Sequence, residues 1–167
     1  LTDANIDIDI ATIDGEIPSA APDTFDKDTP SNNPKSVQRF MKDEAALEKI
    51  KNPINLSSAK AERYEGVYIP GGHGTMWDLP NSKCLADFIA SMDKTGKPVA
   101  AVCHGPAALV NVRNENGEPL VKGRKVNSFT DKEEKEMDMD GSMPFLLERK
   151  LRELGGEFES APPMQAH

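Results

Sequence analysis

The sequence predicts an α/β domain built around a parallel sheet, and three observations support this prediction. Two short apolar runs, residues 67–69 and 99–102, are typical of parallel strands that are covered on both faces. Apolar residues recur at helical spacing between them, from Leu85 to Met92, and Gly96 ends that helix. Strand, loop, helix and strand thus follow one another, as in α/β folds. With 167 residues, we expect one domain that spans residues 1–167.

The first part of the chain is expected to contain one strand, a long loop and one helix. Isoleucines alternate with aspartates in residues 6–10, which predicts a strand with one solvent-facing side. Residues 14–34 are rich in Pro, Asp, Ser and Asn and predict a surface loop. Apolar residues at roughly helical spacing predict a helix over residues 36–50, followed by a turn with a short helix over residues 52–61.

The elements expected after residue 102 alternate between helix and strand again. A proline begins each of the two expected helices, a position where its missing N–H group costs nothing. The expected elements are a helix over residues 106–112, a hairpin-like turn over 114–118, a strand over 125–129, a helix over 144–154 and a strand over 157–161.

Composition and charge exclude several classes of partner. The chain has 20 basic and 28 acidic residues and a net charge of −8, which argues against binding to nucleic acid or to an anionic membrane. It contains no apolar run long enough to span a bilayer and no signal-peptide pattern. Its two cysteines, Cys84 and Cys103, are no disulfide framework, so we expect a reducing, cytoplasmic location. Cys84 directly precedes the apolar repeat from Leu85 to Met92, in the helix expected there, and is interpreted as structural.

The residue that organises the chain is Cys103, which lies where the strand of residues 99–102 turns into a helix. Gly105 and Pro106 break the strand directly after it. A strand-to-helix turn pushes the side chain out of the sheet, and the free N–H groups of a helix start favour a thiolate over a thiol. This pattern predicts a nucleophile, although a cysteine after an apolar run is more often a small buried hydrophobe.

The loops that follow three of the expected strands should meet in one crevice, because ligands of parallel sheets bind beyond the carboxyl ends of the strands. The first loop, residues 70–75, offers glycines whose N–H groups can approach a ligand closely. It lacks the lysine of a phosphate-binding loop and the glycine spacing of a dinucleotide site. The second loop carries Cys103 and His104. The third carries acidic residues at 131–136, which would ordinarily be the solvated start of a helix.

Three motifs together carry a resemblance to a known family. They are Ala-Val-Cys-His-Gly-Pro at residues 101–106, Pro-Gly-Gly-His-Gly at 70–74 and Ser-Phe-Thr-Asp at 128–131. In this order and spacing they resemble the ThiJ/PfpI superfamily, which is related to class I glutamine amidotransferases. The second and third motifs resemble its branch of heat-shock chaperones and glutathione-independent glyoxalases (glyoxalase III). The similarity extends over residues 6–163.

This resemblance implies a flavodoxin-like three-layer sandwich with a mainly parallel central sheet, found in most members as a homodimer. It implies Cys103 as the nucleophile and His104 as its partner, with the oxyanion and substrate site formed by Gly71, Gly72, His73 and Gly105. Family members differ in the position of the third catalytic residue, a carboxylate. Both Asp131 and Glu134 are candidates, and we favour Glu134 because it lies one helical turn after Asp131.

The implied activity is a cysteine-dependent glyoxalase that converts methylglyoxal to lactate, a protein deglycase, or both, combined with stress-chaperone activity. The substrate would be a small α-oxoaldehyde or a glycated amine, and no metal or organic cofactor is expected. One alternative is a non-catalytic holdase that binds unfolded proteins. Another is an intracellular cysteine peptidase or amidohydrolase built from Cys103, His104 and Asp131. An amidotransferase would need a further histidine well downstream of the cysteine, where the chain offers only His167.

The sequence departs from the family at both ends. Family members begin with a strand and a helix that precede the segment at residues 6–10 and carry a glutamate hydrogen-bonded to the nucleophile. They also continue past His167 through another strand and a terminal helix. No residue of this sequence matches that glutamate, so we expect the domain to be partial at both ends.

Overall fold

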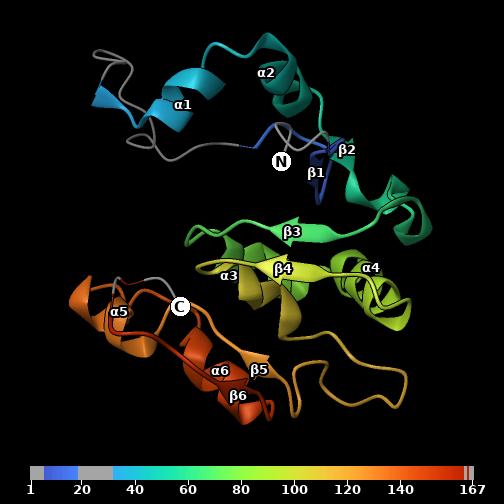
Figure 1. Ribbon diagram of the computed structural model, residues 1–167. Coiled ribbons are helices and arrows are strands. Elements are labelled where there is room, and N and C mark those ends of the chain that lie inside the picture. The colour runs from blue at the N-terminus through green and yellow to red at the C-terminus, as the bar shows by residue number, and fades with distance from the viewer. Residues whose placement is uncertain (1–5, 19–31, 164, 166–167) are drawn as a thin grey trace. The chain divides into compact units, whose positions relative to one another are not determined.

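The computed structural model describes residues 6–18, 32–163 and 165. The chain divides into two compact units, Leu1–Ala59 and Lys60–His167, each of which is described by itself below (Figure 1). The expectation of a single domain over residues 1–167 stays a prediction. No helix among the described residues has the length and apolar character needed to cross a membrane.

The first unit contains a short parallel strand pair, β1 (Ala11–Thr12) and β2 (Ile54–Asn55). The strand expected over residues 6–10 is therefore wrong, and β2 was not predicted. The alternation of isoleucines predicts which side chains could face a core. It does not predict which segment of the chain forms backbone hydrogen bonds with this one. The register of β2 pairs it with Ala11 and Thr12, and of residues 6–10 its N–H groups reach only the carbonyl of Ile10, at 2.8 Å from Ile54 N. The carbonyl of Ile8 instead accepts a hydrogen bond from Lys49 Nζ at 2.7 Å.

The single helix expected over residues 36–50 is wrong too, because the segment forms two helices. They are α1 (Lys35–Phe40) and α2 (Glu44–Lys51). Asp43 separates them: its side chain accepts the backbone N–H of Ala46 at 3.0 Å and caps a new helix. Of the loop expected over residues 14–34, residues 14–18 are irregular as predicted and residues 19–31 lie outside the described residues. A short 3-10 helix, Leu56–Ser58, follows β2.

The second unit contains the strand, helix and strand that the sequence predicts most directly. β3 (Val67–Ile69) and β4 (Val99–Ala101) pair in parallel, and α4 (Lys83–Lys94) connects them (Figure 1). Ser82 caps α4 by accepting the N–H of Leu85, and Gly96, at φ 70°, follows its end. The parallel α/β class is confirmed by these elements.

The remaining elements of this unit lie where the sequence predicts them, but their lengths differ from the predicted lengths. β5 (Lys125–Val126) and β6 (Glu157–Phe158) form a third parallel pair, and each is shorter than its predicted strand. The helix expected over 106–112 is a 3-10 helix, η6 (Gly105–Leu109), and that expected from 144 is α6 (Leu147–Glu153). The others are α3 (Thr75–Asp78), α5 (Asp131–Glu136) and the 3-10 helices Ala61–Arg63 and Leu79–Asn81.

The core of the second unit joins α3, η6 and α6. Its buried members include Met76, Ala107 and Leu151, so the packing of three separate elements fixes the position of the loop that precedes η6. The expectation that residues 99–102 are covered on both faces is wrong. Tyr68 and Val102 point to the same side of the β3–β4 pair and are 57% and 47% exposed, respectively.

Candidate active site

Cys103 occupies a strained turn between β4 and η6. Its φ of 59° lies in the left-handed region, which costs a non-glycine residue on the order of 1–3 kcal/mol. The N–H of Gly105 donates to the carbonyl of Val102 at 2.8 Å and closes the turn. The N–H of Phe129 donates to the carbonyl of Cys103 at 2.9 Å and ties the turn to the third loop. The predicted elbow is therefore present, and its thiol is exposed.

Two of the predicted glycines are required by close approach of the backbone. A Cβ atom on Gly71 would lie 2.6 Å from Cys103 Cβ and 2.8 Å from the carbonyl oxygen of Val102. A Cβ atom on Gly105 would overlap the carbonyl oxygen of Ile69 and lie 3.0 Å from that of Pro70. Both glycines therefore let the loop after β3 pack against the elbow.

The imidazole of His104 links the thiol to a buried carboxylate. Its Nδ1 lies 3.2 Å from Cys103 Sγ, and its Nε2 lies 2.5 Å from Glu134 Oε1. The side chains of His104 and Glu134 are only 1% and 2% exposed. A buried carboxylate needs such partners, so this contact stabilises both groups and holds the ring with Nδ1 toward sulfur.

Glu134 reaches this position because α5 starts with a capping box. Thr130 Oγ1 accepts the N–H of Glu133 at 3.1 Å, and the Glu133 carboxylate accepts the N–H of Thr130 at 2.8 Å. The carboxylate of Glu133 is thus used in capping α5. Glu134, the next residue, is turned inward to the histidines.

His73 completes the cluster from the first loop. Its Nε2 lies 3.4 Å from Glu134 Oε2, and its ring centroid lies 4.3 Å from that of His104. The ring of Phe129 packs against that of His104, with 4.6 Å between the two ring centroids. The three loops after β3, β4 and β5 therefore converge, as the topology of a parallel sheet predicts.

The contacts shift the pKa values of the thiol and the imidazole in opposite directions. The hydrogen bond with His104 lowers the pKa of Cys103 despite partial burial, and the N–H groups of Gly72 and His104 add to the effect. Burial alone would lower the pKa of His104, but its hydrogen bonds with Cys103 and Glu134 outweigh it, so the pKa is raised. The geometry favours a thiolate beside an imidazolium.

Asp131, the other candidate carboxylate, does not join this cluster. It lies at the start of α5, where its Oδ1 accepts the backbone N–H of Arg149 at 3.4 Å and its Oδ2 lies 3.7 Å from Arg149 Nε. Partial burial raises its pKa. Of the two acids proposed from the sequence, the structure therefore brings only Glu134 to His104.

Sequence reasoning missed two contributors to the cluster. It assigned no role to Phe129, because no pattern in the sequence indicates that this ring packs against His104. It also missed the cap formed by Thr130 and Glu133, although Thr-x-x-Glu before a helix is a recognisable capping pattern. Cys84, interpreted from the sequence as structural, is a free and exposed cysteine on α4.

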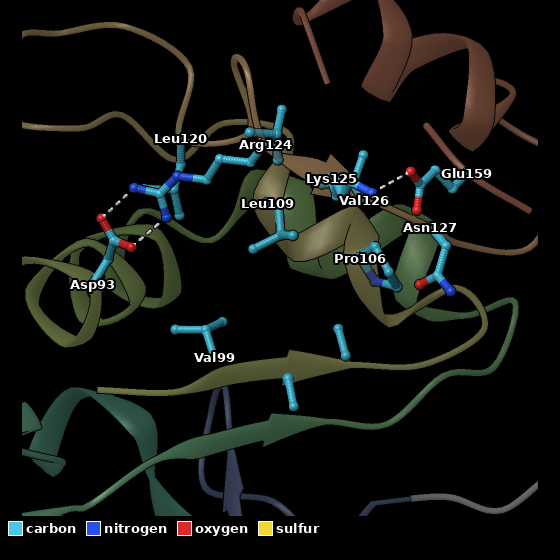
Figure 2. Close-up of a pocket in the computed structure, with 13 residues that line it drawn as sticks. Asp93, Val99, Pro106, Leu109, Leu120, Arg124, Lys125, Val126, Asn127 and Glu159 are labelled. Carbon is cyan, nitrogen blue, oxygen red and sulfur yellow. Dashed lines mark hydrogen bonds and ion pairs between the residues drawn. The ribbon is translucent and has the colours of Figure 1, made fainter. Parts of the chain in front are cut away.

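A cavity of about 440 Å³ lies between β4 and β5 and is separate from the cluster, since neither Cys103 nor His104 lines it (Figure 2). Its lining includes apolar residues of β4 and η6, together with Leu120, Val121 and Val126. Two ion pairs lie at its edge: Arg124 binds Asp93 through two contacts of 2.5 and 3.0 Å, and Lys125 lies 2.8 Å from Glu159 (Figure 2).

The fold and the cluster define an α/β protein with a cysteine on a strand-to-helix elbow, paired with histidine and glutamate. The chain belongs to the DJ-1/PfpI family, whose model matches residues 19–142. The family resemblance deduced from the three motifs is therefore confirmed.

Similar proteins include enzymes and a solved structure of the same fold. Glyoxalase 3 of Candida albicans is 40% identical over 83 residues, which cover 49% of this chain and 35% of that protein. The protein/nucleic acid deglycase HchA of Escherichia coli is 28% identical over 146 residues, which cover 84% of this chain and 48% of that protein.

The X-ray structure of the Francisella tularensis Rapid Encystment Protein has a TM-score of 0.84 and is 31% identical, covering 98% of this chain and 70% of that one. This likeness confirms the predicted fold class. The present chain spans between about a third and a half of the two curated relatives.

Proposed function

We propose that this protein is a cysteine-dependent, glutathione-independent glyoxalase that converts methylglyoxal to lactate. The observation that carries the proposal is the chain of contacts from Cys103 Sγ through His104 to Glu134, in a protein similar to a glyoxalase. A thiolate is a soft nucleophile that adds readily to an aldehyde, and this chain of contacts lowers the pKa of the Cys103 thiol.

In the first step the Cys103 thiolate attacks the aldehyde carbon of methylglyoxal and forms a carbon–sulfur bond. The carbonyl electron pair moves to oxygen, and the His104 imidazolium donates its Nδ1 proton to that oxygen. The product is a hemithioacetal beside a neutral imidazole. The N–H groups of Gly72 and His104, which contact the sulfur in the free protein, are placed to stabilise the developing oxyanion.

In the second step His104 acts as the base, since its Nδ1 lies next to the sulfur. It removes the proton from the former aldehyde carbon, giving an enediolate whose hydroxyl proton passes to the oxygen on the neighbouring carbon, and it returns the first proton to that neighbouring carbon. This leaves a thioester of lactate on Cys103. Water then hydrolyses the thioester, which releases lactate and regenerates the thiol. Glu134 stabilises the imidazolium each time it forms.

The test is lactate formation from methylglyoxal without added glutathione. Wild-type protein should form lactate, and Cys103→Ser should form none above the uncatalysed background. A Cys84→Ser variant is the matched control, because this second thiol is exposed and lies outside the cluster. Equal lactate yields from wild type and Cys103→Ser would refute the proposal.

The same chemistry extends to glycated amines: the carbon–nitrogen bond of the hemiaminal breaks, its hydroxyl proton passes to the departing amine, and Cys103 attacks the aldehyde that this restores. Similarity to a deglycase supports this second substrate class. A peptidase built on Asp131 is less well supported, because Asp131 contacts Arg149 instead of His104. A holdase acting on unfolded proteins would keep its suppression of aggregation in Cys103→Ser.

The family resemblance also motivates a homodimer in the cytoplasm as the working form. Light scattering at defined protein concentration tests the dimer, and microscopy of a fluorescent fusion tests the location.

A further inference from the structure

A cluster of metal-ligating groups lies within the described residues, at the candidate active site itself. His73, His104 and Glu134 each offer one ligand atom, and these atoms lie within 4.8 Å of one another. Two imidazoles and one carboxylate are a ligand set that binds zinc in other proteins and leaves a fourth position for water. We propose that this cluster binds a zinc ion and that bound zinc inhibits the enzyme. The inhibition rests on the proposed function, whereas the binding does not.

The carboxylate of Glu134 lies in contact with both imidazoles of the proposed site. One carboxylate oxygen faces His104 Nε2 at 2.5 Å and the other faces His73 Nε2 at 3.4 Å. Zinc bonds of about 2.0–2.2 Å at tetrahedral angles place neighbouring ligand atoms roughly 3.3–3.5 Å apart. The contact between His73 and Glu134 has this spacing, and that between His104 and Glu134 must open by about 1 Å.

His73 is the member of the cluster that can adjust. Its side chain is 31% exposed, whereas the other two ligands are almost fully buried. It lies between Gly72 and Gly74, and a Cβ atom on either glycine would have no neighbour within 4 Å. A zinc ion can therefore enter from the solvent side, and His73 can close over it.

The cysteine is not a ligand in this proposal. Cys103 Sγ lies 3.2 Å from Nδ1 of His104, whereas Glu134 contacts Nε2 of the same ring. Zinc on Nε2 leaves the ring with its one remaining proton on Nδ1, so the imidazole can no longer accept a proton from the thiol or from an adduct. Zinc would thus block the base while leaving the sulfur free, which distinguishes this site from direct binding of zinc to a thiolate.

The experiment is a titration of the chain with zinc chloride in competition with a chromophoric chelator. All proteins carry Cys84→Ser, which removes the other exposed thiol. We expect one zinc per chain, affinity within about threefold of this parent for Cys103→Ser, and affinity at least about tenfold weaker for His73→Gln and Glu134→Gln. Asp131→Asn, which alters a carboxylate on the same helix but outside the cluster, should bind like the parent.

X-ray absorption at the zinc edge provides a second measurement that needs no ligand variant. It should show nitrogen and oxygen ligands only. A sulfur at about 2.3 Å, loss of binding in Cys103→Ser, or parental affinity in His73→Gln would overturn the zinc site.

Lactate formation should fall as zinc fills the site and return on chelation, and unaltered activity at full occupancy would overturn the inhibition. If the zinc-free chain forms no lactate, the proposed function fails, while the binding measurements still decide the site.

Discussion

Replacing Glu134 with glutamine is expected to slow alkylation of Cys103 at neutral pH by about tenfold. The carboxylate accepts a hydrogen bond from buried His104 at 2.5 Å. A hydrogen bond to a charged group contributes about 1.5–3 kcal/mol, and about 1.4 kcal/mol corresponds to a tenfold change in an equilibrium constant, so losing this bond should lower the pKa of His104. Because the hydrogen bond with His104 is the main cause of the lowered pKa of Cys103, the thiolate fraction should fall with it.

The assay is the rate of reaction with iodoacetamide as a function of pH, followed by mass spectrometry of the intact protein. Cys84→Ser serves as the background, because Cys84 is exposed and would otherwise react as well. Asp131→Asn is the matched control: it removes a carboxylate three residues earlier on α5 that contacts Arg149. Far-ultraviolet circular dichroism checks that each variant is folded.

The result that would refute the reasoning is a pH profile of Glu134→Gln that matches its parent, or one that matches Asp131→Asn. Either outcome would mean that the negative charge of Glu134 does not reach the thiol through His104. A shift of the Glu134→Gln profile to higher pH, with Asp131→Asn unshifted, is the expected pattern.

Two further predictions concern pH and packing. Because the pKa of Cys103 is lowered and that of His104 is raised, the thiolate–imidazolium pair should exist between these two values, so alkylation should begin at lower pH than for a free thiol. A profile that coincides with that of a free thiol would contradict this. Gly105→Ala should reduce the free energy of unfolding by about 1–3 kcal/mol, since its methyl group would overlap the carbonyl of Ile69. Urea denaturation measures the change, and Gly141→Ala, where a Cβ would meet open space, should leave the midpoint nearly unchanged.

Local signals in the sequence were sufficient for the elements around the elbow. The apolar runs of β3 and β4 and the helical repeat of α4 each extend over consecutive turns or residues and end at Pro70, Cys103 or Gly96. Their side-chain pattern alone distinguishes strand from helix. The first unit gave weaker signals, because its strand pair has only two residues on each side and the partners lie far apart in the sequence.

The choice between the two candidate carboxylates could not be made from spacing. Residues three apart on a helix lie on one face, so Asp131 and Glu134 have similar directions. The capping box and the neighbouring α6 separate them, since Arg149 of α6 contacts the first acid and leaves the second to His104.

By itself, the sequence determined that Cys103 lies on a strand-to-helix elbow with His104 beside it, because strand, turn and helix are set by neighbouring residues. Only the tertiary structure decided what surrounds that elbow. Glu134 lies 30 residues from His104 and 61 residues from His73 along the chain. Their contacts arise because the loops after successive parallel strands end at the same edge of the fold, where packing of α3, η6 and α6 fixes which side chains meet.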